Sequence, residues 1–171
     1  MASDADRLWR DTLRLTRESG DDLVVDLITQ HLELKAPWTT KLCGAAGVLY
    51  HRFGHPTGVT IYASPKVGEA IWAVAGAGMV GPVLVDWGAP VAGLAAAERT
   101  AQFAGDSKAF THYQGGWIGV AQSIAVPLIR DGQGLAVVEV RSHEASKFEI
   151  GEAELIGQVA FVLSQGWPVR Q

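Results

Sequence analysis

The sequence is poor in cysteine and in long apolar runs. Cys43 is the only cysteine among 171 residues, which excludes an intrachain disulfide and a zinc site built on paired cysteines. No uninterrupted apolar run reaches the roughly 18 residues needed to span a bilayer. The N-terminal sequence MASDADRLWRD lacks the apolar core of a signal peptide. We therefore expect a soluble, cytoplasmic protein without a membrane segment.

Basic residues are also scarce relative to acidic ones. The chain has 14 Lys and Arg against 18 Asp and Glu, for a net charge of -4. Without a basic stripe to displace counterions from phosphates, a nucleic-acid partner is not expected. Apolar residues make up 48% of the chain and charged residues 19%, which is typical of a globular protein that can bury one core.

One domain is the natural expectation for residues 1–171 because no repeat, linker or low-complexity segment divides them. Within it we expect N-terminal helices over 1–36, a sheet and pocket segment over 37–150, and a C-terminal helix over 151–166. The organisation is therefore helices at both ends with strands between them.

The helices are indicated by spacing and by stop signals. Residues 4–19 carry spaced apolar side chains among charges, and a second helix is expected to begin at Asp21 and to end before Pro37. Residues 93–104, GLAAAERTAQFA, favour a helix by composition. Residues 151–166 place their apolar side chains in one stripe, which indicates a closing helix.

The strands are indicated by short apolar runs. Residues 43–53 and 57–64 flank a Gly-His-Pro sequence, which predicts two strands joined by a turn. Residues 81–87, GPVLVDW, are a further extended candidate. Residues 122–142 predict a hairpin around an Asp-Gly turn, because Asp and Gly accept left-handed backbone. Pro127 in this hairpin should lie at an edge or a bulge, where no ladder amide is required.

The chain from Ser123 onward carries a recognisable pattern. SIAVPLIRDGQGLAVVEVRS would supply the last two strands, and FEIGEAELIGQVAFVL the final helix. This stretch resembles the end of a GAF domain, a small-molecule sensing module related to PAS domains. The resemblance implies an α+β fold with an antiparallel sheet, helices on both faces, and N- and C-terminal helices packed together. The hairpin would then be scaffold, with the pocket in residues 60–120.

The same resemblance suggests the class of function. GAF domains enclose cavities for cyclic nucleotides, bilins, haem, amino acids or small anions, so we expect a small-molecule-binding sensory or regulatory protein. No kinase, cyclase or DNA-binding segment is evident in the sequence, so its output should pass through a partner protein. One alternative is a haem-binding sensor or haem-dependent enzyme on the same fold.

A second alternative is an enzyme like the free methionine sulfoxide reductases, which share this fold. Members of that group work through several cysteines that form and resolve a disulfide, a cycle that Cys43 alone cannot complete within one chain. The spacings also indicate no Ser-His-Asp arrangement or carboxylate pair. We therefore do not expect catalysis by side chains, and a cofactor remains the route by which an activity could arise.

Aromatic and imidazole side chains mark the expected pocket. Tryptophan offers an apolar wall and one N–H donor, which suits a flat or anionic ligand, although the alternative for each tryptophan is a place in the core. The expected ligand contacts are Tyr62, Trp72, Trp87, His112, Tyr113 and Trp117, with His112 as the axial ligand if haem is bound. No metal site is expected.

Two other features have ordinary interpretations. The glycine-rich residues 75–81 lack the Gly-Lys-Ser/Thr of a phosphate loop, so close packing or a flexible lid is expected there. Cys43 heads an apolar run and is expected to be a buried small hydrophobe rather than a nucleophile.

The terminal helices carry more apolar surface than one sheet face needs. Phe161 and Val162 lie off the main apolar stripe of the last helix, and Trp9 adds to the first. Such surface is usually covered by a second copy. We therefore expect a homodimer through the terminal helices.

Overall fold

The structure is a computed structural model that describes residues 20–64, 66–105 and 119–168. The expected helix over residues 4–19 lies outside this part of the chain. None of the described helices is long and apolar enough to cross a membrane. The elements are α2 (Asp21–Glu33), α3 (Trp38–Phe53), β1 (Thr57–Ala63), β2 (Ile71–Gly78), β3 (Leu84–Val85), α4 (Ala92–Glu98), β4 (Gln102–Ala104), β5 (Gln122–Arg130), β6 (Gln133–Ser142) and α5 (Ile150–Gly166).

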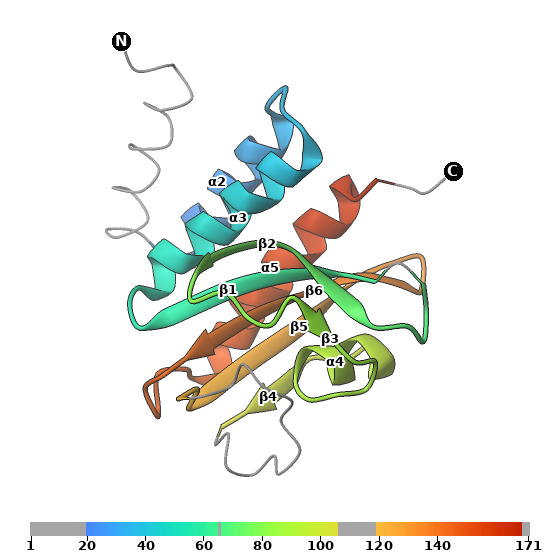
Figure 1. Cartoon of the computed structure of the whole chain (residues 1–171). Helices are drawn as coiled ribbons and strands as arrows, with labels where there is room; N and C mark the ends of the chain where they lie inside the picture. The colour runs from blue at the N-terminus through green and yellow to red at the C-terminus, as the bar shows by residue number, and fades with distance from the viewer. Residues whose placement is uncertain (1–19, 65, 106–118, 169–171) are drawn as a thin grey trace.

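The strands form one antiparallel sheet in the order β3-β2-β1-β6-β5-β4. Helices α2, α3 and α5 cover one face, and the short helix α4 covers the other (Figure 1). Helix α2 packs against α3 and α5, so N-terminal and C-terminal helices meet. This architecture confirms the expected α+β fold with helices on both faces.

The sheet separates two apolar layers because successive strand residues point to opposite faces. Ile61 pairs with Val138, and both belong to the core beneath α2, α3 and α5. Their neighbours Tyr62 and Val137 also pair, but belong to the core beneath α4. We call these the helix-layer face and the α4 face.

The predicted C-terminal hairpin is confirmed. Asp131 and Gly132 form its turn with positive φ values of 52° and 75°, the left-handed backbone expected there. Strand β4 pairs with β5 only as far along as Ala125. Pro127 therefore lies beyond the end of β4, where its missing N–H costs no ladder hydrogen bond.

The strand expected over residues 43–53 is wrong, because this segment forms most of α3. Its buried apolar positions recur at helical spacing: Leu42, Ala45, Ala46, Leu49 and Phe53. Cys43 lies between the buried positions and is exposed, so the prediction of a buried Cys43 is also wrong. Gly54, with φ of 70°, ends α3 and leads into β1 rather than closing a hairpin.

The middle of the chain is less regular than expected. Within residues 81–87 only Leu84 and Val85 form a strand. The helix expected over 93–104 stops at Glu98 because Arg99 adopts a left-handed φ of 56°. The chain then continues as the short edge strand β4.

Candidate functional site

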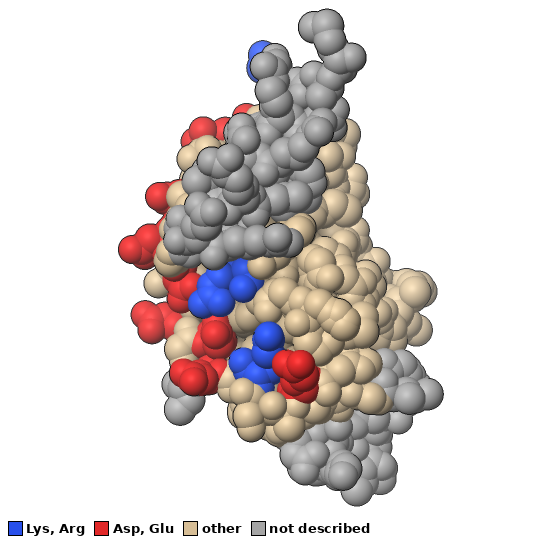
Figure 2. Space-filling model, turned by 90° about the vertical axis from the view of Figure 1, so that its left-hand side faces the viewer, with Lys and Arg blue, Asp and Glu red and all other residues tan. Residues whose placement is uncertain are grey.

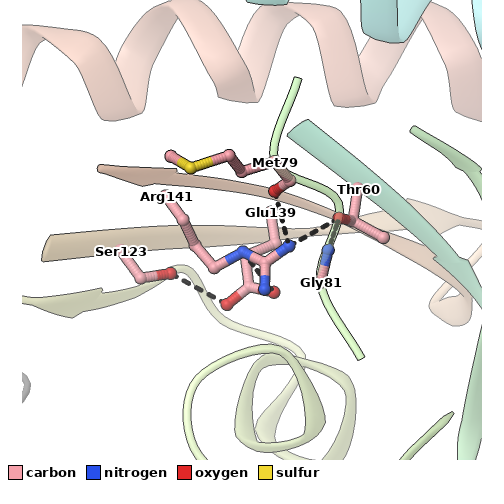
Figure 3. A network of polar contacts seen from close by, with 6 residues as sticks. All are labelled: Thr60, Met79, Gly81, Ser123, Glu139 and Arg141. Atoms are coloured by element: carbon pink, nitrogen blue, oxygen red, sulfur yellow. Dashed lines mark hydrogen bonds and ion pairs between the residues drawn. The ribbon is translucent and has the colours of Figure 1, made fainter. Parts of the chain in front are cut away.

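A cluster of five buried polar side chains lies on the α4 face, where β1, β6 and β5 run side by side. Thr60 pairs with Glu139 across β1 and β6, and Ser123 pairs with Arg141 across β5 and β6. These four side chains point to one face of the sheet (Figure 3). Tyr62, two residues from Thr60 on β1, points to the same face. None of the five is more than 3% exposed. We call this group the polar cluster.

One carboxylate oxygen of Glu139 accepts a hydrogen bond and the other does not. Ser123 Oγ donates a hydrogen bond of 2.8 Å to Glu139 Oε1. Glu139 Oε2 lies 3.8 Å from Arg141 Nε, which is an ion pair but too long for a hydrogen bond. Among the described residues no hydrogen-bond donor reaches Oε2, so this oxygen retains its capacity to accept.

The Arg141 guanidinium joins the sheet to the loop between β2 and β3, residues 79–83. Its Nη2 donates to Thr60 Oγ1 at 2.7 Å and to the Met79 carbonyl at 3.4 Å (Figure 3). The backbone N–H of Gly81 donates to the same Thr60 oxygen at 2.8 Å. Thr60 therefore holds both the buried cation and the β2–β3 loop.

Two glycines allow the β2–β3 loop to approach so closely. A Cβ on Gly58 would lie 1.9 Å from the Met79 carbonyl oxygen. A Cβ on Gly81 would lie 2.2 Å from Arg141 Nη2 and 2.3 Å from the Tyr62 hydroxyl oxygen. Gly81 is the last residue of the glycine-rich segment 75–81. At Gly81 the structure shows the close packing that was one of the two roles expected for this segment.

Burial has the largest effect on the pKa values of Glu139 and Tyr62. It raises the pKa of Glu139 above the ordinary value, although Arg141, Ser123 and Tyr62 act in the opposite direction. Burial, followed by the charge of Glu139, also raises the pKa of the Tyr62 phenol, so Tyr62 stays a neutral donor. The two groups lie close enough to influence each other's pKa, but the hydroxyl has no hydrogen bond of normal geometry among the described residues.

Three of the residues expected from the sequence can be placed. Tyr62 belongs to the polar cluster. Trp87 packs against the α4-face core and lines a hollow of about 10 Å³. Trp72 follows Ile71 and precedes Ala73, the residue that pairs with Tyr62, so it points to the opposite face and is half-exposed. The structure thus brings Tyr62 and Trp87 to one face and leaves Trp72 on the other.

The other three expected contacts, His112, Tyr113 and Trp117, lie outside the described residues. The described chain does, however, fix where that segment starts and ends. Ala104 at the end of β4 pairs with Ser123 near the start of β5, so the chain leaves and re-enters the described structure beside the polar cluster. Among the described residues no group of three or more side chains is arranged to hold a metal ion.

Four cluster residues were not expected from the sequence: Thr60, Ser123, Glu139 and Arg141. We expected the C-terminal hairpin to be scaffold, and three of the four cluster residues lie on it. The available signal was the sequence VVEVRS, in which Glu139 and Arg141 alternate with valines. When one face of a strand carries two charges and the other face is apolar, the charged face meets either solvent or a buried polar site.

A larger hollow lies elsewhere, at the turn end of the C-terminal hairpin. It measures about 450 Å³ and is lined by Lys66, Arg130 and Trp167 among others, a size that suits a small molecule. Its two basic groups already have partners. Arg130 Nη1 donates to the carbonyls of Ser164 and Trp167 at 3.0 Å each, and Lys66 pairs with Glu69 at 3.1 Å. We therefore place the candidate site at the polar cluster, where the Tyr62 hydroxyl and Glu139 Oε2 are among the buried atoms that make no hydrogen bond of normal geometry within the described residues.

No protein-family model and no curated protein matches the sequence. Solved structures do match the fold. A free methionine-R-sulfoxide reductase from Neisseria meningitidis, in complex with its substrate, is 23% identical with a TM-score of 0.77. The match covers 97% of this chain and 92% of the reductase.

GAF domains match at similar levels. One GAF domain structure is 16% identical, covers 94% of this chain and 90% of its own, and has a TM-score of 0.79. The GAF domain of a phosphoenolpyruvate-protein phosphotransferase from Coxiella burnetii is 16% identical, with coverage of 83% and 89% and a TM-score of 0.72. The antiparallel six-stranded sheet, its helices and these matches together identify the fold of this chain as that of a GAF domain.

Proposed function

We propose that this chain is a small-molecule-binding sensory or regulatory protein that acts through a partner protein. One observation carries the proposal: Tyr62 and Glu139 bury a donor and an acceptor that, although near each other, make no hydrogen bond of normal geometry among the described residues. An unsatisfied buried polar group costs about 1–3 kcal/mol, and such groups are uncommon in folded proteins. A ligand that accepts from the Tyr62 hydroxyl and donates to Glu139 Oε2 would recover this cost.

The proposed ligand is small and polar and carries an anionic group together with a hydrogen-bond donor. The anionic group suits the buried guanidinium of Arg141, and the donor suits Glu139. Trp87 supplies an apolar wall on the same face. His112, Tyr113 and Trp117 remain proposed contacts, since their segment begins and ends beside Ser123. We also keep a cytoplasmic location as part of the proposal.

An enzymatic alternative comes from the methionine-R-sulfoxide reductases among the structural matches. Reduction of a sulfoxide by thiols takes two electrons, and the two thiols that supply them are oxidised to a disulfide. Cys43 is the only cysteine of the chain and lies exposed on α3. The sheet therefore separates its thiol from a molecule bound at the polar cluster, which favours binding over reduction.

The haem alternative rests on His112, outside the described residues. Among the described residues buried on the α4 face there is no imidazole or thiol to serve as an axial ligand. The absorbance spectrum of the purified protein tests this alternative, because a bound haem would give a strong visible band.

Methionine sulfoxide distinguishes binding from reduction. Purified protein is titrated calorimetrically with free methionine-R-sulfoxide and is separately incubated with the sulfoxide and dithiothreitol. We expect no turnover, and any affinity should be the same in wild type and Cys43→Ser. Dithiothreitol-dependent reduction that Cys43→Ser abolishes would overturn the proposal in favour of the reductase alternative.

We further propose a homodimer through the terminal helices. Phe161 on α5 is 64% exposed, beside a groove lined by Val25 of α2 and Gly157 and Val162 of α5. A large aromatic side chain exposed at the edge of an apolar groove is typical of an association surface.

A further inference from the structure

The polar cluster is closed to solvent in the described structure. None of Thr60, Tyr62, Ser123, Glu139 and Arg141 is more than 3% exposed, so a molecule can reach them only if a covering element moves. The strands β1, β6 and β5 that carry the cluster are held by continuous pairing along the centre of the sheet. The movement that admits a ligand must therefore come from an element that lies over these strands.

Among the described residues, helix α4 and the β2–β3 loop both cover the cluster. Ala92 and Ala95 of α4 belong to the same apolar core as Tyr62. The loop covers the cluster from the side of β2, because a Cβ on Gly81 would lie 2.3 Å from the Tyr62 hydroxyl oxygen and 2.2 Å from Arg141 Nη2. Either element would have to move to expose these two groups.

Burial holds α4 in place much more firmly than it holds the loop. Ala92 and Ala95 are 0% exposed, whereas Met79, Val80 and Val83 of the loop are 39%, 52% and 69% exposed. Segments with few buried apolar contacts open at a lower free-energy cost than the packed core does. The loop is therefore the cover that opens more readily.

The loop's own side chains make no ion pair with the rest of the molecule. Residues 79–83 contain no Asp, Glu, Lys or Arg. The side of the molecule that carries β2 and β3 faces right in Figure 2 and shows no charged atoms where it is described. What holds the loop closed is therefore its backbone.

Backbone hydrogen bonds join the loop to the polar cluster (Figure 3). The Gly81 N–H donates to Thr60 Oγ1 at 2.8 Å, and the Met79 carbonyl accepts from Arg141 Nη2 at 3.4 Å. The Met79 N–H also donates to the Thr57 carbonyl, at the long distance of 3.5 Å. Arg141 Nη2 donates to Thr60 Oγ1 as well, at 2.7 Å. One hydroxyl oxygen, that of Thr60, is thus bonded both to the loop and to the guanidinium beneath it.

The two ends of the loop are placed where a hinge could lie. Strand β2 ends at Gly78, whose φ of 68° is left-handed backbone that glycine adopts readily. At the other end, the Val83 carbonyl accepts from the Ala73 N–H at 2.9 Å and leads into β3. Hinges are usually a few residues at the ends of elements. Residues 79–82 can therefore move while β2 and β3 stay paired.

We infer that residues 79–82 form a gate over the polar cluster, and that the Thr60 hydroxyl keeps this gate closed. Opening of the gate exposes the Tyr62 hydroxyl and the Arg141 guanidinium, to which the proposed ligand would bind. Thr60 is then a positioning residue, because it acts through the loop. The use of the gate for ligand entry rests on the proposed function, whereas its opening does not.

Amide hydrogen exchange of the full-length protein measures the opening of the gate. The Gly81 N–H exchanges whenever the gate opens, whereas the Val140 N–H of the central strand β6 exchanges through larger unfolding. We expect measurable protection at Gly81 that is at least about 100-fold smaller than at Val140 and depends little on urea. Equal protection with equal urea dependence would overturn the inference, because the gate would then not open by itself. Absence of protection at Gly81 would also overturn it, because the gate would then not be closed.

The variants Thr60→Val and Thr60→Ser test the role of the hydroxyl. Valine keeps the shape of threonine without the hydroxyl, and serine keeps the hydroxyl. Relative to Val140, Gly81 should lose about tenfold of its protection in Thr60→Val, since two hydrogen bonds are removed, and less than about threefold in Thr60→Ser. Taking the ratio to Val140 removes any general loss of stability. Equal ratios in the two variants would show that the hydroxyl does not keep the gate closed.

Arginine modification tests access to the cluster. 2,3-Butanedione in borate reacts with accessible guanidinium groups, and mass spectrometry of peptides gives the rate at each arginine. Arg141 should react slowly in wild type and in Thr60→Ser, and about tenfold faster in Thr60→Val, in line with the expected change in exchange. The exposed Arg99 is the control and should react equally in all three proteins. Equal rates at Arg141 in the three proteins would overturn the inference, because the gate would then not control access.

The proposed function is judged separately, by ligand-induced shifts in the melting temperature of the wild type. If the gate opens as expected and no compound gives a shift, the gate stands and the ligand site falls. If a compound gives a shift and Gly81 exchanges only through the unfolding that exposes Val140, the ligand site stands and the gate falls.

Discussion

Gly81 lies directly against the buried guanidinium of Arg141, and a methyl group on Gly81 would come within 2.2 Å of its Nη2 atom. This close contact ties the β2–β3 loop to the polar cluster. It also makes Gly81 a position that tolerates no side chain without movement of the loop, of Tyr62 or of Arg141.

Gly81→Ala should therefore destabilise the protein by about 1–3 kcal/mol, the usual cost of overpacking. Urea unfolding measures the change. Gly151→Ala is the matched control, because a Cβ there meets nothing within 4 Å and alanine favours the helix by about 0.5–1 kcal/mol. If Gly81→Ala is as stable as wild type, the β2–β3 loop does not approach Arg141 and Tyr62 as closely as described.

Tyr62→Phe and Ser123→Ala should differ in stability although both remove one buried hydroxyl. The Tyr62 hydroxyl has no hydrogen-bond partner among the described residues, so its loss should cost less than about 0.5 kcal/mol. Ser123→Ala leaves Glu139 Oε1 without its donor and should cost about 1–3 kcal/mol. Equal costs in urea unfolding would show that the Tyr62 hydroxyl is engaged in the free protein.

Glu139→Gln should change how stability depends on pH. Folding raises the pKa of Glu139 above its ordinary 4.5, so the folded state favours the protonated carboxyl. The resulting contribution to stability is fully present below pH 4.5 and is lost as pH rises through the folded pKa. Glutamine does not titrate, so the free energy of unfolding of Glu139→Gln relative to wild type should increase from about pH 4 to about pH 8.

The control for this series is Glu154→Gln, which removes one exposed carboxylate from α5. Urea unfolding of the three proteins across the pH range supplies the comparison. If the stability of Glu139→Gln relative to wild type falls as pH rises, the cluster stabilises the Glu139 carboxylate. That result would contradict a pKa of Glu139 raised by burial.

Phe161→Asp should convert the proposed homodimer into a monomer, because it places a charge on the exposed apolar groove of α2 and α5. Light scattering at micromolar concentration measures the mass. Val83→Asp is the control and should remain dimeric, since Val83 lies in the loop before the edge strand β3 and does not line this groove. A wild-type monomer would contradict the dimer directly.

The C-terminal third of the chain could be predicted from sequence because its signals agree with one another. The alternating residues of the hairpin, its Asp131-Gly132 turn and the stripe of α5 all indicate one arrangement. Residues 43–53 carry no such agreement. A short apolar run fits both a buried strand and a buried helix, and α3 packs against α2 and the sheet at once.

The polar cluster could not be predicted because it depends on strand register. Thr60 and Arg141 are 81 residues apart in the sequence and share a hydrogen bond only because β1 and β6 are neighbours. The direction of Trp72 likewise follows from its pairing with Ala63 and not from local spacing. Aromatic composition indicated a pocket segment but not which faces its members occupy.

The central claim is that a ligand binds at the polar cluster through Tyr62. Melting temperatures test it most directly, with a panel of free amino acids, methionine sulfoxide, small carboxylates and nucleotides added to wild type, Tyr62→Phe and Trp72→Ala. A ligand that binds only the native state raises the melting temperature. A compound that stabilises wild type should stabilise Trp72→Ala equally, because Trp72 lies on the opposite face, and should stabilise Tyr62→Phe much less. Equal stabilisation of Tyr62→Phe and wild type, with the effect lost in Trp72→Ala, would contradict the claim.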